Sequence, residues 1–404
     1  MSVKTNIVQW EKSDTLHFCG LLKLPMRQHK HDRMMNILSN LTVRGFKSIR
    51  ELVDFELTSL NVFIGANGSG KSNLISFFKL VQKIAENKAN SYIQQHGGIN
   101  DFLFNGRKVT ERIIFRIGFQ NHQYGFSIIE VTSPEISCRV DEEEIAGDQI
   151  LPVIVYGTDQ LNFARNPEDQ AVTLAKDAFD YIYKNIQSWQ IYHFNDTNKT
   201  AGIRNLEIIQ DDSRLCSDAA NLAPFLLKLK NEWSDEYQQI VNAVRLVIPY
   251  FSDFNLEVRK FGDAEKINLS WFQKDSDYPF QPYHLSDGSI RFIALATALL
   301  QPEPPSLIII DEPELGLHPE AIHILAELIK DAARRTQVIV ATQSPTLLDN
   351  FAVEDIVVVN RENGASTFRR LNEKDFKVWL EDYSVGELWT KNVITGGPFF
   401  EQRH

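Results

Sequence analysis

Apolar and polar residues alternate through the first part of the chain. Between residues 37 and 65 the alternation is broken by a turn at Gly45, which predicts two or three strands. Further alternating runs at 112–119 and 124–132 are separated by a polar turn. These runs predict an antiparallel sheet.

A different pattern begins at residue 283. The runs 307–310, 337–341 and 356–360 are short and wholly apolar, and a helical pattern at 319–334 separates the first two. Strands buried on both faces have this pattern, and their alternation with helices predicts a mostly parallel sheet. The chain is therefore expected to be an α/β protein.

These patterns divide the chain into four expected regions. They are a poorly ordered extension (1–34), a first lobe (35–132), an inserted lateral α/β region (133–282) and a second lobe (283–404). In the extension, His29 and His31 are expected in a solvated tail rather than a metal site. The insertion carries helical patterns near 170–190, 219–230 and 235–248 and strand patterns near 254–260 and 266–272. No heptad pattern is sustained, which argues against a coiled-coil arm.

The stretch 60-LNVFIGANGSGKSNLISFF-78 joins an apolar strand to an amphipathic helix through a glycine-rich turn. It matches the phosphate-loop pattern G-x-x-x-x-G-K-[ST], in which inward-facing N–H groups and a helix N-terminus bind phosphate. Lys71 is expected to reach the β- and γ-phosphates, and the Ser72 hydroxyl to bind Mg²⁺. The expected nucleotide-binding residues of the loop are Gly65, Ala66, Asn67, Gly68, Ser69, Gly70, Lys71, Ser72 and Asn73.

Asp311 and Glu312 directly follow the apolar run 307–310. The carboxyl ends of parallel strands face the crevice where nucleotides bind. Asp311 is therefore expected to hold Mg²⁺, usually through water, and Glu312 to polarise the attacking water as a general base. A solvated acidic turn is the alternative, and the phosphate loop in the same chain disfavours it. Asp311 lies 240 residues after Lys71, so an insertion must separate the two halves of the site.

Together these segments resemble the SMC/RecF-like ABC ATPases, in particular the stand-alone bacterial RecF/OLD-like AAA-type ATPases associated with DNA repair or phage defence. The segments are GANGSGKSN (65–73), LSDGS (285–289), DEP (311–313), ELGLHP (314–319) and TQSP (342–345). The resemblance covers about 36–130 and 283–396. It implies an ABC-type P-loop NTPase head with a mostly parallel core sheet, an antiparallel β subdomain and a mixed, largely helical insertion.

The same resemblance assigns further residues. The family opens with a strand and a Gly-Phe-Lys-Ser turn near the bound base, as in 41-LTVRGFKSIRE-51, which implies nucleotide contacts from Arg44 and Lys47. The signature residues Ser286, Asp287 and Gly288 would contact the γ-phosphate held by a second copy. By itself, Ser286 also reads as an ordinary helix N-cap. The loop that would cross the dimer interface comprises Leu315, Gly316, Leu317 and His318.

Two departures from the family pattern stand out. The signature is LSDGS rather than LSGGQ, so Asp287 replaces a glycine beside the phosphate site, which RecF-like members tolerate and which disfavours a transporter. Gln343 stands where most ABC ATPases have a switch histidine, and it is expected to act catalytically through a hydrogen bond without a charge. The alternative is a loop residue with no catalytic role. The glutamine of the Q-loop is not assigned by the sequence.

Composition limits the partners. The net charge of −11 argues against a uniformly basic nucleic-acid binder, so DNA contact would need a local patch or a partner. The scattered cysteines Cys19, Cys138 and Cys216 form neither a disulfide framework nor a zinc site, which suits a reducing cytoplasm. Apolar runs such as 292–300 are far shorter than the roughly 20 residues that span a bilayer, so no membrane association is expected.

The leading hypothesis is an ATPase that uses ATP and Mg²⁺ and acts as an ATP-gated homodimer or higher homo-oligomer in DNA repair or anti-phage defence. The alternative is a slowly turning sensor or assembly module that controls a separate effector protein. A transporter subunit is disfavoured by the motif spacing. An OLD-type nuclease is disfavoured because only 59 residues follow Pro345, too few for a Toprim domain.

Overall fold

The computed structural model describes residues 37–86, 88–119, 122–130, 136–139, 154–156, 160–162 and 182–394. The chain divides into two compact units, Met1–Met34 and Met35–His404. The extension expected at residues 1–34 lies outside the described residues, as does much of the first part of the expected insertion.

A six-stranded sheet forms the centre of the second unit, with the strand order β19-β18-β3-β17-β16-β9. Five of its strands are parallel, and β19 pairs antiparallel with β18. The strands are β3 (Leu60–Ile64), β9 (Gln190–Tyr192), β16 (Leu307–Asp311), β17 (Gln337–Thr342), β18 (Ile356–Glu362) and β19 (Ala365–Arg370). The mostly parallel core sheet expected from the sequence is confirmed. Strand β9 comes from within the range expected to be an insertion.

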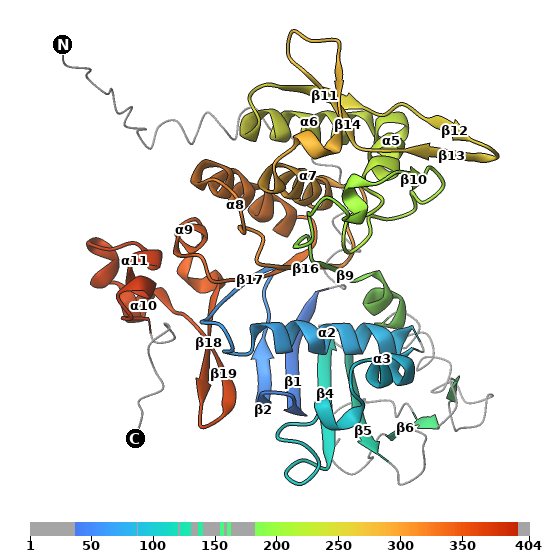
Figure 1. Ribbon diagram of the computed structural model, residues 1–404. Coiled ribbons are helices and arrows are strands. Elements are labelled where there is room, and N and C mark those ends of the chain that lie inside the picture. The colour runs from blue at the N-terminus through green and yellow to red at the C-terminus, as the bar shows by residue number, and fades with distance from the viewer. Residues whose placement is uncertain are drawn as a thin grey trace. The chain divides into compact units, whose positions relative to one another are not determined.

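Both faces of the sheet are buried at its centre, which explains why the central strands β3, β16 and β17 are mostly apolar. In β16, Ile308 and Ile310 face one hydrophobic cluster, while Leu307 and Ile309 face another. The first cluster includes residues of α5 (Leu222–Glu232), α6 (Ser234–Val247), α7 (Asp287–Leu300) and α8 (Pro319–Ala333). The second cluster includes residues of α2 (Lys71–Ala85) and the antiparallel sheet. Figure 1 shows α7 and α8 on one side of β16 and β17, and α2 on the other.

The expected antiparallel β subdomain is a five-stranded sheet with the order β2-β1-β4-β5-β6. Its strands are β1 (Leu38–Phe46), β2 (Ile49–Glu56), β4 (Arg112–Phe119), β5 (His122–Glu130) and β6 (Ile136–Arg139). Aromatic rings fill the space between this sheet and α2. Phe77 of α2 contacts Phe115 of β4 with ring centroids 5.4 Å apart and Phe46 of β1 at 5.8 Å. These contacts fix the helix that follows the phosphate loop.

The remaining described elements are small. They are α3 (Ala89–Gln95), α9 (Pro345–Leu348), α10 (Glu373–Phe376), α11 (Val385–Thr390) and the strands β7 (Ile154–Tyr156), β8 (Gln160–Asn162), β10 (Glu207–Ile208), β11 (Phe251–Asn255), β12 (Arg259–Phe261), β13 (Ala264–Ile267), β14 (Ser270–Gln273) and β15 (Pro279–Phe280). Strands β10 to β15 form two three-stranded sheets, so this region contains a substantial share of strands beside the helices α5 and α6.

A buried glutamine links the two large sheets. Gln337, at the start of β17, is 2% exposed. Its Oε1 accepts a hydrogen bond from the Leu38 N–H of β1 at 3.1 Å, and its Nε2 donates to the carbonyls of Leu38 and Thr58 at 2.8 and 2.9 Å. The side chain therefore satisfies one donor and two acceptors of the main chain.

We expect Gln337→Met to lower the free energy of unfolding by about 3 kcal/mol. Methionine keeps the volume, but it leaves buried main-chain groups unpaired, and each such group costs about 1–3 kcal/mol. Urea denaturation measures the difference. Gln94→Met on the exposed surface of α3 is the matched control and should change stability by less than about 0.5 kcal/mol. An equal effect of both substitutions would contradict this role for Gln337.

Candidate nucleotide site

Four loops leave the core sheet at the same edge. Parallel pairing aligns Asp311 with Ala341, Thr342 with Ile64, and Ile310 with Tyr192. The carboxyl ends of β3, β17, β16 and β9 are therefore in register. The phosphate loop, the loop at Gln343, the acidic loop and the loop at His193 all begin there, at the edge where open α/β sheets bind ligands.

The glycines of the phosphate loop permit the backbone conformation that it adopts. Gly70 has a φ of 119°, in the left-handed region, and a Cβ there would collide with the hydroxyl of Ser366. Lys71 begins α2 and is 6% exposed. Its Nζ donates to the carbonyls of Gly65 and Ala66 at 2.5 and 3.2 Å, so the ammonium lies across the loop. Burial lowers the pKa of Lys71, and the nearby carboxylates of Glu312 and Asp311 oppose this shift.

Two serine hydroxyls support the loop, one of them from a strand that the sequence did not link to it. Ser366 of β19 donates to the Ser69 carbonyl at 2.6 Å and lies 2.7 Å from the Ser48 hydroxyl. The Asn73 amide donates to Ser48 at 2.7 Å. Ser48 lies in the Gly-Phe-Lys-Ser turn between β1 and β2, so this turn contacts the first turn of α2. Ser72 itself is exposed.

The two basic residues expected near the nucleotide lie in different places. Lys47 has a φ of 47°, donates to Ser76 of α2 at 2.7 Å and stands 4.8 Å from the Phe102 ring centroid. It lines an open cavity of about 450 Å³ together with Ser48, Asn73, Asp101 and Arg361. Burial lowers its pKa, and Asp101 opposes the shift.

Arg44 instead pairs with Glu51 on the neighbouring strand, with Nε 3.0 Å from Oε1. Both side chains are about half exposed, and the pair lies on the antiparallel sheet. The contacts of the structure thus bring Lys47, but not Arg44, to the start of α2.

Asp311 and Glu312 emerge at the end of β16. Glu312 has a φ of 46°, and its N–H donates to the Ala341 carbonyl at 2.8 Å. A left-handed non-glycine residue costs on the order of 1–3 kcal/mol, and such residues cluster at active sites. Burial raises the pKa of Asp311, and the charge of Glu312 raises it further. Two adjacent carboxylates of this kind favour a nearby cation.

The residues present fit a magnesium ion held with the nucleotide. The described residues contain no group of three or more His, Cys, Asp or Glu side chains suited to binding a metal by themselves. The expected ligands are instead the Ser72 hydroxyl and the Asp311 carboxylate. Mg²⁺ usually takes one or two protein oxygens, keeps several waters and binds substrate phosphates. The donor set at the end of β16 and the start of α2 matches that preference.

His193 is a neighbour of Asp311 that the sequence did not predict. It follows β9, and its Nδ1 lies 3.9 Å from Asp311 Oδ2. Burial, aided by the charge of Lys79, lowers the pKa of His193 to about 4, so the contact is not an ion pair at neutral pH. Its Nε2 is buried and has no hydrogen-bond partner among the residues that the structure describes. A three-residue strand gives almost no sequence signal, which is why this position was missed.

Gln343 and Glu314 connect the acidic loop to the loop after β17. The Gln343 amide donates to the Glu312 carboxylate. Glu314 accepts from the Thr342 hydroxyl at 2.6 Å and from the Gln343 N–H at 3.3 Å, and its other oxygen is buried without a partner. Burial raises the pKa of Glu314. Glu314 thus fastens the loop that presents Gln343 to Glu312, a role that the sequence did not indicate.

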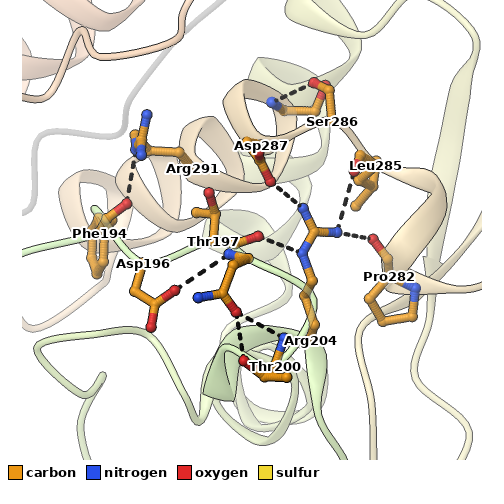
Figure 2. Close-up of polar contacts among 12 residues, drawn as sticks. Phe194, Asp196, Thr197, Thr200, Arg204, Pro282, Leu285, Ser286, Asp287 and Arg291 are labelled. Atoms are coloured by element: carbon orange, nitrogen blue, oxygen red, sulfur yellow. Dashed lines mark hydrogen bonds and ion pairs between the residues drawn. The ribbon is translucent and has the colours of Figure 1, made fainter.

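The signature segment begins helix α7. Ser286 caps it by accepting from the Ser289 N–H at 3.0 Å. A Cβ at Gly288 would collide with the Gly316 carbonyl, so this glycine permits close contact with the loop 315–318. In that loop Leu315 is 48% exposed, Gly316 has a φ of 77°, and His318 precedes α8. Figure 2 shows Asp287 facing Arg204, and Arg291 of the same helix reaching Phe194.

Comparisons with known proteins identify a family and several relatives of this chain. Residues 60–150 and 155–349, more than half of the chain, match the family described as "AAA domain, putative AbiEii toxin, Type IV TA system". A relative, the "Retron Vc95 probable ATPase" of Vibrio cholerae serotype O1 biovar El Tor, is 21% identical over 383 residues. The alignment covers 80% of this chain and 73% of the relative.

Solved structures of SMC head domains share the fold. One is an SMC head bound to the C-terminal winged-helix domain of ScpA, with a TM-score of 0.56 at 18% identity, covering 84% of this chain and 99% of that chain. Another has an extended coiled coil and is bound to the C-terminal domain of ScpA derived from Pyrococcus furiosus. Its TM-score is 0.51 at 17% identity, covering 85% of this chain and 98% of that one.

The chain belongs to the AAA-domain family whose description is quoted above. Its fold is similar to that of SMC ATPase head domains, as the sequence predicted.

We expect Lys71→Ala to weaken ATP binding about a hundredfold or more. The substitution removes the charge-assisted hydrogen bonds of a buried ammonium, each worth about 1.5–3 kcal/mol, and 1.4 kcal/mol is tenfold in affinity. Isothermal calorimetry with Mg-ATP measures the effect. Lys88→Ala, which removes an exposed lysine, is the control and should bind normally. Wild-type affinity in Lys71→Ala would show that the phosphate loop is not the binding site.

Proposed function

We propose that this chain binds ATP with Mg²⁺ and hydrolyses it at the carboxyl edge of the core sheet. The observation that carries the proposal is the convergence of Lys71, Asp311, Glu312 and Gln343 on adjacent loops of one parallel sheet. Membership of the AAA-domain family and the retron ATPase relative support it.

Each residue has a role that its surroundings support. Lys71 turns from the loop carbonyls to the β- and γ-phosphates when nucleotide enters. Glu312, held by the Ala341 carbonyl and by the Gln343 amide, accepts a proton from the attacking water. Gln343 orients this carboxylate and can donate to the γ-phosphate. Ser72 and Asp311 would hold Mg²⁺, which neutralises developing charge on the phosphates when it is bound.

We further propose that the ATP-bound form is a homodimer. Ser286 and Asp287 hydrogen-bond with Ser289 and Arg204, and none of the described hydrogen bonds joins them to the phosphate loop of their own chain. A helix start that accepts an anion would therefore serve a second copy. The exposed Leu315, in the loop packed against Gly288, would lie at the same interface.

The cellular role proposed is DNA maintenance or anti-phage defence in the cytoplasm. The family description includes a toxin–antitoxin system, which by its name pairs one component with another. This favours the second candidate function, a nucleotide-gated module that turns over slowly and controls a separate effector. A single burst of phosphate release followed by slow turnover would support that candidate, while stimulation of steady turnover by DNA would support a DNA-associated enzyme.

No helix in the described part of the chain has the length and apolar character needed to cross a membrane.

We expect Glu312→Gln to bind Mg-ATP and to accumulate as a dimer. The amide keeps the shape of the carboxylate but cannot accept the proton, so the ATP-bound state persists and mass action favours association. Light scattering with and without saturating Mg-ATP measures the mass.

The control is Glu312→Gln combined with Lys71→Ala, which should remain at its nucleotide-free mass. A monomer in Glu312→Gln with saturating Mg-ATP would contradict the proposed dimer.

We expect Gln343→Ala to lower kcat about a hundredfold with little change in ATP affinity. It removes the donor that holds Glu312, and a lost polar contact in a transition state costs roughly 2.7–4 kcal/mol. Steady-state ATPase kinetics test this, with Gln94→Ala on exposed α3 as the matched control and Glu312→Gln as the inactive reference. A kcat within about threefold of wild type would make Gln343 a bystander.

A further inference from the structure

Arg204 makes an unusual set of contacts for a residue in a loop. It ends the short turn Gly202–Arg204, and its side chain is only 6% exposed. Its Nε donates to the Thr197 carbonyl at 2.7 Å, and its Nη1 donates to the carbonyls of Pro282 and Leu285 at 2.5 and 3.2 Å. Figure 2 shows the guanidinium between the segment 197–204 and the start of α7.

The third nitrogen of this guanidinium, Nη2, contacts a residue of the signature segment 285–289. Arg204 Nη2 lies 2.8 Å from Asp287 Oδ1. Asp287 is 68% exposed and stands in the first turn of α7, directly after the N-cap Ser286. Asp287 is also the residue that departs from the family motif, where a glycine carries no charge. Arg204 therefore places a positive charge next to the negative charge that Asp287 introduces in place of a glycine.

The charge of Asp287 matters because of where it lies. A helix N-terminus carries a partial positive charge and exposed N–H groups, which favour a bound anion. An unpaired carboxylate in that first turn would repel an incoming phosphate. The nearly buried guanidinium of Arg204 faces this carboxylate at hydrogen-bond distance and offsets its charge, while solvent screens the exposed Asp287 side of the pair.

We propose that Arg204 is a positioning residue of the site formed between two copies. It holds the segment 282–287 through its main-chain carbonyls and neutralises Asp287, so that the start of α7 accepts the γ-phosphate of an ATP bound by the other copy. This inference rests on the proposed ATP-dependent dimer. To that dimer the inference adds Arg204, which lies outside every sequence motif and contributes a positive charge beside the signature segment.

A second arginine fixes the same region independently. Arg291 of α7 is 5% exposed and donates to the carbonyls of Phe194, Asn195 and Leu315. The segment that begins at His193 therefore stays attached to α7 when Arg204 is replaced. Loss of Arg204 is thus expected to act on the charge and setting of the segment 285–287 more than on folding.

The test uses the full chain in the Glu312→Gln background, with Mg-ATP, and measures the dimer dissociation constant by sedimentation. Arg204→Ala should raise this constant at least tenfold, because it leaves Asp287 uncompensated. Adding Asp287→Asn to Arg204→Ala should restore most of the loss. Arg204→Lys keeps the charge and should stay within about threefold of the parent. Lys260→Ala, which removes an exposed cation of β12, is the control and should change nothing.

Separate readouts distinguish the charge from a general loss of structure. Fluorescence titration with an ATP analogue should give an unchanged affinity for the Arg204→Ala monomer, because its phosphate loop is intact. Asp287→Asn alone, an exposed change that does not threaten folding, removes the anion that Arg204 offsets and should tighten the dimer.

Several results would overturn the inference. They are an unchanged dimer in Arg204→Ala, no recovery on adding Asp287→Asn, a tenfold loss in Asp287→Asn alone, or a loss in Arg204→Lys as large as that in Arg204→Ala. A Glu312→Gln parent that stays monomeric would instead remove the proposed dimer itself, and the inference with it.

Discussion

The site depends on the register of four parallel strands. Asp311 pairs with Ala341 and Thr342 pairs with Ile64, so the acidic loop, the loop at Gln343 and the phosphate loop begin at one level. A slip of two residues in one strand would move its loop by about 6.6 Å, beyond hydrogen-bond reach of the others. A slip of one residue would turn Ile308 and Ile310 away from their hydrophobic cluster. Burial of both faces of the sheet therefore specifies the site as well as the fold.

Charge is the second constraint on this edge. Lys71 is buried beside Glu312 and Asp311, and burial raises the pKa of Asp311 and Glu314 while it lowers that of Lys71. Buried charges persist only when they are paired or hydrogen-bonded. Glu314 meets this requirement through Thr342 and Gln343. Among the described residues, Asp311 contacts His193, which is neutral near pH 7, and the charges of Lys71 and Lys79 offset part of the rise in its pKa. The arrangement favours a cation at Asp311, as the proposed binding of Mg-ATP would supply.

The sequence predicted the parts of the site that local chemistry determines. The glycines around Lys71 and the acids after an apolar strand have patterns that hold within a few residues, and the fold confirms the strands and helices that carry them. Strand β9 was missed because three residues give no periodicity. Ser366 and Glu314 were missed as supporting residues because their contacts come from tertiary pairing, which no local pattern records. The run 337–341 could be predicted to lie beside the strand that ends at Asp311, and the structure confirms this pairing. The order of the other strands emerged only from the structure.

The segment after β9 shows why such residues matter. It starts at His193 beside Asp311, is fixed to α7 by Arg291, and ends at Arg204 against Asp287. One stretch of chain therefore contacts both the edge where nucleotide is proposed to bind and the helix start proposed to meet another copy. In a chain whose signature segment carries an acid instead of a glycine, the same stretch also supplies the charge that makes this helix start suitable for an anion.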